Sequence, residues 1–228
     1  MNFHYLWHDI QHGLFHFDKG IIFTTKELFT RPGHTTREYL AGKRVSHFKP
    51  ISMVLVLSGV YALLYHIFHI EMLKGAVKVS GSGQAFIDLN NIVENVILWM
   101  GEHYEVIALA QLPFAAFGTY VAFRKWGYNY VEHFILNAFI TSQSLIVHIV
   151  LFPFVYALNG SPALRDFSNV ENIISLVLLV WVLMQFFNTH KKLSILGRTV
   201  VSLIIYSLFY AIIFCSVVAI NYYFIKPV

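Results

Sequence analysis

The sequence predicts an all-α, polytopic membrane helix bundle. Of the 228 residues, 57 % are hydrophobic and only 12 % are charged, whereas soluble domains carry roughly a quarter charged residues. Several uncharged stretches reach the length of about twenty residues that a helix needs to cross a bilayer. The single cysteine, Cys215, excludes a disulfide framework and a cysteine-based zinc site. We therefore expect about five transmembrane helices, preceded by an N-terminal amphipathic helical segment.

Five stretches are predicted to span the membrane. The first is "PISMVLVLSGVYALLYHIFHI", from Pro50 to Ile70, which carries no Asp, Glu, Lys or Arg. The other four are expected at residues 106–123, 134–158, 173–188 and 199–225. Pro113 and Pro153 lie inside the second and third spans, and a proline there removes a backbone donor and kinks the helix.

The chain divides at the first span. We expect residues 1–49 to form a cytoplasmic amphipathic helical segment and residues 50–228 to form the transmembrane bundle. Between the first two spans, apolar residues recur at helical spacing over residues 85–104, opposite Asp88, Glu94 and Glu102. This pattern predicts an amphipathic helix on the outer surface of the membrane.

Basic residues are distributed unevenly between the two sides of these spans. With five spans, twelve Lys and Arg residues fall on the side of the N-terminus and four on the other side. The positive-inside rule then places the N-terminus in the cytoplasm and the C-terminus outside. The bias also accounts for the basic composition, so we expect the bilayer and not a nucleic acid as partner.

Four histidines recur at every fourth residue of the opening stretch "HYLWHDIQHGLFHF". On a helix they share one face, opposite apolar residues that suit the lipid headgroup region. The histidines in question are His4, His8, His12 and His16. Three interpretations stay open: a solvated polar face, a Zn²⁺ or other divalent-metal site, and a face that becomes charged near the histidine pKa.

Two short helices are predicted before the first span. The first, "TTKELFTRPG", has Thr24 or Thr25 as its cap and is stopped by "RPG". The second, "HTTREYLAGKR", has Thr35 or Thr36 as its cap and Gly42 just past its end. Together with the N-terminal histidines, three basic residues of this segment are expected to face lipid or a protein partner: Arg37, Lys43 and Arg44.

The stretch "HFDKGIIFTTKELFTRPGHTTREYLAGKRVSHFKPISMVLVLS" resembles the core of a bacterial family of polytopic membrane proteins, known only as domain of unknown function 3667. The matching pattern is an aspartate, a Thr-rich helix, "RPG", "REYLAGKR" and a "KP" that enters the first span. The matching positions are Asp18, Thr25, Pro32, Gly33, Arg37, Tyr39, Gly42, Lys43, Arg44 and Pro50. The resemblance implies a multi-pass protein of the bacterial inner membrane. Many relatives begin with a zinc ribbon that this sequence lacks, so no zinc role transfers, and the family implies no activity.

Polar residues at helical spacing form a stripe along the third span. The stripe consists of His133, Asn137, Thr141, Ser144 and His148. Polar side chains at this depth face the interior of a bundle or a water-filled cavity. The stripe therefore either makes interhelical hydrogen bonds that fix the packing, or lines a wet pathway.

A second polar cluster is predicted near the outer ends of the first two spans. It consists of His66 and His69 after the first span, and Glu102, His103 and Glu105 before the second. Histidines with carboxylates bind Zn²⁺ or another divalent metal, or relay protons. The alternative is that these are only interfacial residues at helix ends, and no cofactor is required.

The leading functional hypothesis is a small channel or transporter whose path is lined by the stripe of the third span. We expect it to be a homo-oligomer, because five helices enclose little volume alone. The first alternative is a membrane scaffold that docks a protein partner or anionic lipid through its N-terminal segment. The second is a metal-dependent membrane enzyme at the outer His/Glu cluster, but the sequence has no P-loop, HExxH or GxSxG motif and does not favour an enzyme.

Overall fold

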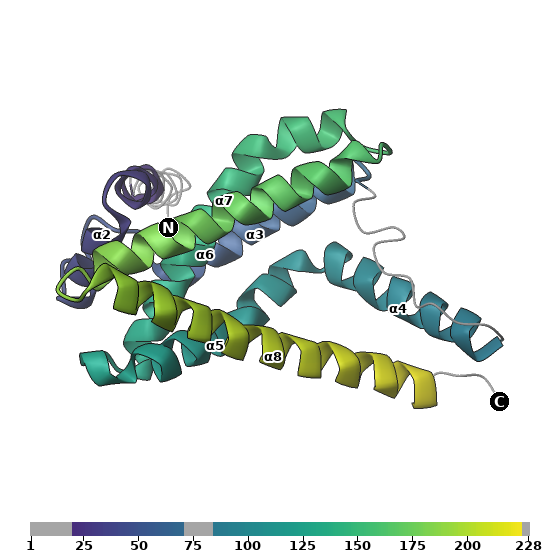
Figure 1. Cartoon of the computed structure of the whole chain (residues 1–228). Coiled ribbons are helices and arrows are strands. Elements are labelled where there is room, and N and C mark those ends of the chain that lie inside the picture. The colour runs from purple at the N-terminus through teal and green to yellow at the C-terminus, as the bar shows by residue number, and fades with distance from the viewer. Residues whose placement is uncertain (1–19, 71–83, 225–228) are drawn as a thin grey trace, which may run out of the picture.

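The computed structural model describes residues 20–70 and 84–224, and over these residues it consists of helices and short connections without a strand (Figure 1). The all-α prediction is therefore confirmed. The four N-terminal histidines and Asp18 lie outside the described residues.

A helix that includes residues 20–30 opens the described chain. It is followed by α2 (Pro32–Leu40), α3 (Pro50–Ile67), α4 (Gln84–Glu102), α5 (Tyr104–Phe123), the 3₁₀ turn η1 (Arg124–Trp126), α6 (Tyr130–Ala157), α7 (Ala163–Phe186) and α8 (Lys192–Phe224). Five of these helices, α3 and α5 to α8, are long and apolar enough to cross a membrane. They are compatible with a multi-pass integral membrane protein.

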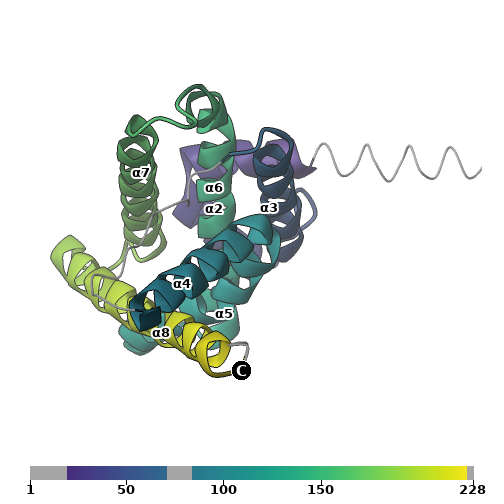
Figure 2. The same cartoon turned by 90° about the vertical axis from the view of Figure 1, so that its right-hand side faces the viewer.

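Helix α6 lies at the centre of the bundle, where it packs against α3, α5 and α7 (Figures 1 and 2). Helix α5 also packs along α8, and at Gly118 the two backbones come close together. A Cβ atom added at Gly118 would lie only 2.8 Å from the carbonyl oxygen of Ser202. Small residues at such crossings let membrane helices approach each other closely. Helix α4, expected at residues 85–104, is present and packs against α8, while its place on the outer membrane surface stays a prediction.

The predicted threonine caps of the two short helices are wrong. Thr24 and Thr25 lie inside the first helix, and α2 begins at Pro32, ahead of Thr35 and Thr36. A proline fits the first turn of a helix because the N–H it lacks would have no partner there. The hydroxyls of the two threonines of α2 instead donate to the carbonyls of residues 31 and 32, each at 3.0 Å. The predicted end is confirmed, because Gly42 has φ +100° just past α2.

The fourth and fifth spans begin earlier than the hydropathy of the sequence predicts. Helix α7 starts at Ala163 instead of residue 173, and α8 starts at Lys192 instead of residue 199. The first turns of α7 carry charged residues, which lower the hydropathy although the helix continues. As a result, Glu171 is part of a helix long and apolar enough to cross the membrane.

Candidate functional site

A cavity of about 750 Å³ lies where six helices meet, at the end of the bundle from which α7 starts. Side chains from α3, α4, α5, α6, α7 and α8 line it, and Figure 2 shows these helices from that side. Its walls combine aromatic and apolar side chains with several polar ones. The polar side chains other than tyrosine are Gln111, His148, Arg165, Ser168, Asn169, Glu171 and Asn172.

Glu171, in the third turn of α7, is the most unusual group of this cavity. Only 4 % of the residue is exposed, and its Oε1 atom is buried without a hydrogen-bond partner. The carboxyl group interacts electrostatically with Tyr61, Tyr65 and Tyr104. An ionisable side chain inside a membrane protein costs stability, so its presence there indicates a function.

Tyrosine rings from α3 and α5 form one wall of the cavity. The Tyr61 and Tyr65 hydroxyls are hydrogen-bonded at 2.9 Å, one turn apart on α3. The Tyr61 ring packs edge to face against Tyr104, with 5.0 Å between the ring centroids. The Tyr61 ring also lies 5.7 Å from the ring of His148, measured between centroids. This wall therefore offers a ligand both hydroxyl groups and aromatic faces.

The structure divides the polar stripe of α6 between two environments. His148, at one end, lines the cavity, and its Nε2 atom lies 3.3 Å from the Ser175 hydroxyl of α7. Asn137, towards the other end, donates from Nδ2 to the Thr119 hydroxyl of α5 at 2.8 Å. Thr141 and Ser144 lie between them and are half-buried. The amide of Asn137 thus links α6 to α5, whereas the imidazole of His148 lines the cavity.

Aromatic packing fills the bundle around His133, at the end opposite the cavity. The residue is fully buried, and the rings of Tyr120, Phe123 and Phe187 surround it within 6.5 Å between centroids. The rings of Phe123 and Phe187 stack in parallel at 4.4 Å. Aromatic rings thus enclose the stripe at His133, and both ring nitrogens of this residue are buried without a hydrogen-bond partner.

The predicted outer cluster of histidines and carboxylates does not come together as a metal site in the part of the chain that the structure describes. Among the described residues no group of three or more His, Cys, Asp or Glu side chains could hold a metal ion. His66 and His69 are exposed at the end of α3, and the His103 ring stacks on Trp99 at 4.7 Å. The Oε2 atom of Glu105 is buried without a hydrogen-bond partner, and the Glu102 side chain lies outside the description.

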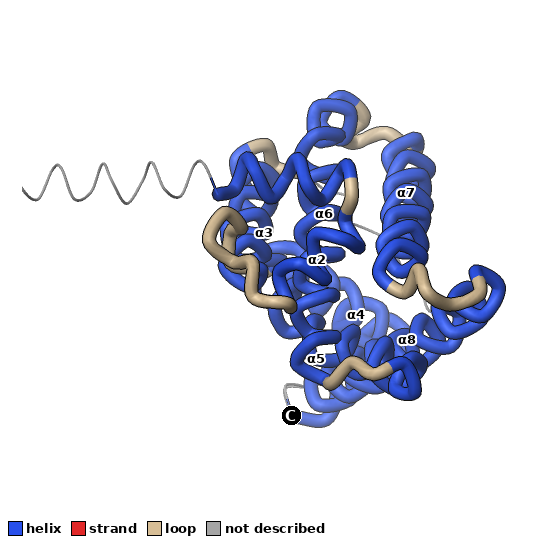
Figure 3. The backbone as a smooth tube through the Cα atoms, turned by 90° about the vertical axis from the view of Figure 1, so that its left-hand side faces the viewer, coloured by secondary structure: helices blue, strands red, loops and turns tan. Residues whose placement is uncertain are grey.

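A second polar feature lies where α2 meets the end of α7, at the bundle end seen in Figure 3. The backbone N–H of Gly33 donates to Oε1 of Gln185 at 3.2 Å. A Cβ atom at Gly33 would lie 2.3 Å from the backbone nitrogen of Phe186, so only glycine fits. Arg37 donates to the carbonyls of Gln185 and Phe186, the latter at 2.7 Å. We call this contact the α2–α7 junction.

Arg37 therefore satisfies carbonyls that the end of α7 leaves without intrahelical partners, and its positive charge suits the negative end of the helix dipole. It also contacts the Asn188 side-chain oxygen at 3.2 Å and Nδ1 of His34 at 2.8 Å. The other two basic residues of the predicted lipid- or partner-facing set are more exposed. Lys43 lies 3.6 Å from the Glu38 carboxylate, and Arg44 lies over the ring of Tyr39.

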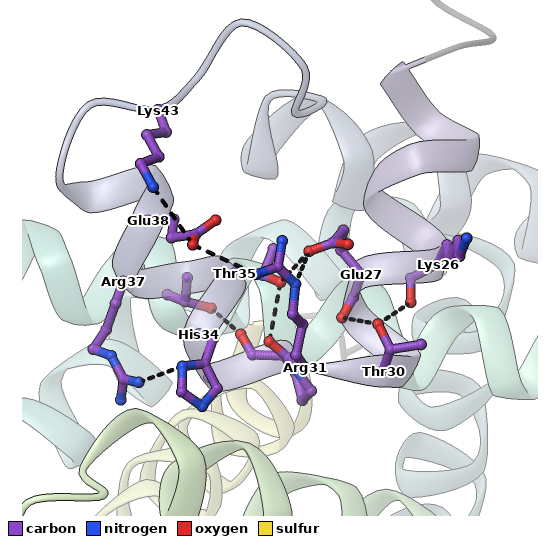
Figure 4. A network of polar contacts seen from close by, with 12 residues as sticks. Lys26, Glu27, Thr30, Arg31, His34, Thr35, Arg37, Glu38 and Lys43 are labelled. Carbon is purple, nitrogen blue, oxygen red and sulfur yellow. Dashed lines mark hydrogen bonds and ion pairs between the residues drawn. The ribbon is translucent and has the colours of Figure 1, made fainter.

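Salt bridges and hydrogen bonds hold the first helix and α2 together (Figure 4). The Glu27 carboxylate contacts Nε of Arg31 at 2.6 Å and accepts from the Thr35 hydroxyl at 3.2 Å. The hydrogen bond with Glu27 and its negative charge raise the pKa of the Arg31 guanidinium. The first helix is also tied to α6, because Gln143 donates to the Leu28 carbonyl at 2.8 Å.

The five long apolar helices are compatible with one class of protein, the multi-pass integral membrane proteins. Comparison with known proteins adds a match between part of the chain and one protein family. Residues 18–62 match the family described as "Protein of unknown function (DUF3667)". No curated protein and no solved structure matches the chain. The matched segment contains the first helix, α2 and most of α3, and its Gly33 and Arg37 build the α2–α7 junction.

The cavity residues of α7 lie outside the span that the sequence predicts. The hydropathy predicts a fourth span that begins at residue 173 and so excludes Ser168 and Glu171, although both lie in the helix. One signal could have found them. Ser168, Glu171 and Ser175 follow each other at helical spacing, in the same way as the stripe on the third span.

Proposed function

We propose that this protein is a membrane transporter that takes up a small solute into the Glu171 cavity from one side of the membrane. The observation that carries this proposal is a buried carboxylate without a hydrogen-bond partner on Oε1, in the wall of a cavity of about 750 Å³. Cavities of this size that combine apolar walls with a few polar groups are typical of small-molecule sites.

A transporter is favoured over an open channel because the polar stripe does not continue through the bundle. Asn137 uses its amide in a contact between α6 and α5, and aromatic rings surround His133. A solute that enters the cavity therefore meets closely packed helices before it reaches the other side. Transport then requires a conformational change that opens this end.

Cysteine labelling tests the access of water to the cavity. In a chain with Cys215→Ala, we expect Ser168→Cys to react with a membrane-impermeant thiol reagent. Ser142→Cys is the matched control, because Ser142 is fully buried on α6 and should not react. The reactivity of Ser144→Cys with the same reagent shows whether water reaches the middle of the polar stripe of α6. An unreactive Ser168→Cys would contradict a cavity that is open to water.

Transport itself is tested by charge movement across proteoliposomes on a solid-supported membrane. The reconstituted protein is exposed to concentration jumps of organic cations, amino acids and sugars in turn. We expect a transient, saturable current with at least one class, and a loss of that current in Glu171→Gln. No current with any class, together with unreactive Ser168→Cys, would refute the transporter and favour the scaffold.

We further propose that the N-terminus is cytoplasmic, in a bacterial inner membrane. The support is the bias of basic residues, which include Arg124 and Lys125 of η1 on the side of α2. A reporter that is active only outside the cell should function when fused after Val228 and fail when fused before Met1. The homo-oligomer stays a prediction, and the cavity does not depend on it, because one chain provides all its walls.

A further inference from the structure

The walls of the Glu171 cavity have the chemistry that recognises an organic cation. Tyr61, Tyr104, Tyr210 and Phe214 contribute aromatic surface from three different helices. The faces of aromatic rings carry negative charge density and attract cations, most strongly where water is excluded. Glu171 adds a carboxylate to the same cavity.

The size of the cavity argues for a bulky ligand. A volume of about 750 Å³ falls within the range of sites that enclose drug-sized molecules. A bare metal ion needs several ligand atoms close together, and among the described residues no group of three or more His, Cys, Asp or Glu side chains provides them. Ile97, Met100 and Ile107 complete the apolar part of the wall.

One of the two charged groups in the wall, the carboxylate of Glu171, has an oxygen that a cation could pair with. Arg165 lines the cavity too, but it lies in the first turn of α7 and already has an interaction of its own. The Oε1 atom of Glu171 has no hydrogen-bond partner, so it is available to a ligand. A buried carboxylate without such a partner is stabilised by a positive charge that enters beside it.

We propose that the cavity binds a bulky, lipophilic, monovalent organic cation, with Glu171 as its counter-charge and Tyr61, Tyr104 and Tyr210 as its aromatic contacts. This names a substrate class for the proposed transporter and rests on that function. Binding, however, can be measured in detergent without any transport, so the two proposals can fail separately.

Equilibrium dialysis of the purified full chain with radiolabelled tetraphenylphosphonium tests the proposal. Tetraphenylborate has the same shape and the opposite charge, and empty micelles correct for partition into detergent. We expect saturable binding of one tetraphenylphosphonium per chain and no saturable binding of tetraphenylborate. Glu171→Gln should raise the Kd for tetraphenylphosphonium at least tenfold, whereas Glu171→Asp, which keeps the charge, should retain most of the affinity.

Matched variants separate the carboxylate of Glu171 from a general effect on the fold. Glu105→Gln removes a half-buried carboxylate whose Oε2 atom also lacks a hydrogen-bond partner but which does not line the cavity, so the Kd should not change. Tyr210→Leu removes a partly exposed ring and should raise the Kd about three- to tenfold, whereas Tyr210→Phe keeps the ring and should not. These tyrosine variants keep the proposal testable if Glu171→Gln does not fold.

Three results would overturn the cation site. They are equal saturable binding of tetraphenylborate and tetraphenylphosphonium, an unchanged Kd in a folded Glu171→Gln, and an equal Kd for Tyr210→Leu and Tyr210→Phe. Saturable binding without any transport current would retain the cation site and refute the transporter. A current with sugars or amino acids, without binding of tetraphenylphosphonium, would retain the transporter and refute the cation site.

Discussion

The two ends of the bundle differ in the hydrogen-bond partners of their charged side chains. At the end with α2, Arg37 and Arg198 each donate to carbonyls at the C-terminal end of a long helix, α7 for the first and α5 for the second. At the other end, Glu171 is buried with one carboxylate oxygen that accepts no hydrogen bond. Charges that pair with backbone carbonyls stabilise a fold, whereas a buried charge without a partner costs stability. The comparison therefore separates an end where arginines cap helices from the end where we propose that a ligand binds.

The largest expected effect comes from filling the close contact of the α2–α7 junction. Gly33→Leu places a side chain where even a Cβ atom would lie 2.3 Å from a backbone nitrogen. We expect the free energy of unfolding to fall by about 3 kcal/mol or more, because α2 must move away from α7. Thermal unfolding in detergent measures this change.

The control for this variant is Gly59→Leu on α3, where an added Cβ meets nothing within 4 Å. It should unfold close to the wild-type temperature. If the two ends are independent, Gly33→Leu also leaves the thiol reactivity of Ser168→Cys unchanged at a temperature where both are folded. A lower reactivity would show that the cavity depends on the junction.

The second largest effect is a decrease in the free energy of unfolding when Arg37 is removed from the α2–α7 junction. Arg37→Ala removes a charged donor from the carbonyls of Gln185 and Phe186. Hydrogen bonds of charged groups are worth about 1.5–3 kcal/mol, so we expect a loss of about 2 kcal/mol in the free energy of unfolding. Lys43→Ala is the control, because an exposed ion pair contributes about 1 kcal/mol or less. Equal losses in the two variants would contradict the role of Arg37 as a helix cap.

The third effect tests the hydrogen bond between α6 and α5. Asn137 and Thr119 are joined at 2.8 Å, and a double-mutant cycle with Asn137→Leu and Thr119→Val isolates their coupling. Interhelical hydrogen bonds in membrane proteins average about 0.6 kcal/mol, so we expect a coupling of roughly 0.5–1.5 kcal/mol. Additive effects of the two substitutions would instead mean that Asn137 has another role.

The smallest effect is a dependence of stability on pH at His47, ahead of the first span. Burial lowers the pKa of this imidazole, while the backbone of Lys43 and the negative charges of Glu27 and Glu38 act in the opposite direction. The unfolded chain therefore binds a proton more readily, and stability falls as the pH drops below about 6.5. Thermal unfolding at pH 7.5 and 5.5 measures this loss.

His47→Phe keeps an aromatic ring beside Phe23 and Tyr39 and cannot be protonated. We expect this variant to lose less stability than the wild type between the two pH values. If both lose the same amount, other groups cause the acid sensitivity.

Hydropathy predicts the spans of this fold well wherever uncharged residues fill the helix. The sequence predicts the first span at residues 50–70, and α3 runs from Pro50 to Ile67. It fails at α7 because a helix does not end where its side chains become polar, and backbone hydrogen bonds continue through Arg165 and Glu171. Hydropathy does not find Glu171 for the same reason, because polar residues inside a membrane helix lower the hydropathy by which a span is recognised.

The long-range contacts of Arg37 and Gly33 could not be predicted for a different reason. The "RPG" and "REYLAGKR" motifs mark positions, but the partners of the two residues, Gln185 and Phe186, stand about 150 positions later in an apolar stretch without a motif. A pattern confined to one segment contains no information about what it packs against. The same holds for the cavity, whose walls come from six helices.

The distance along the chain between Arg37 and α7 has a consequence for the order of events during synthesis. Ribosomes add about 5–20 residues per second, so the carbonyls that Arg37 binds emerge roughly 7–30 s after it. During this time α2 exists without its partner helix, and Arg37 has His34 of the same helix but not the carbonyls of α7 as a partner. The capture of the end of α7 by α2 is then a late step in assembling the bundle, and α8, which follows α7 in the chain, still has to pack against α5.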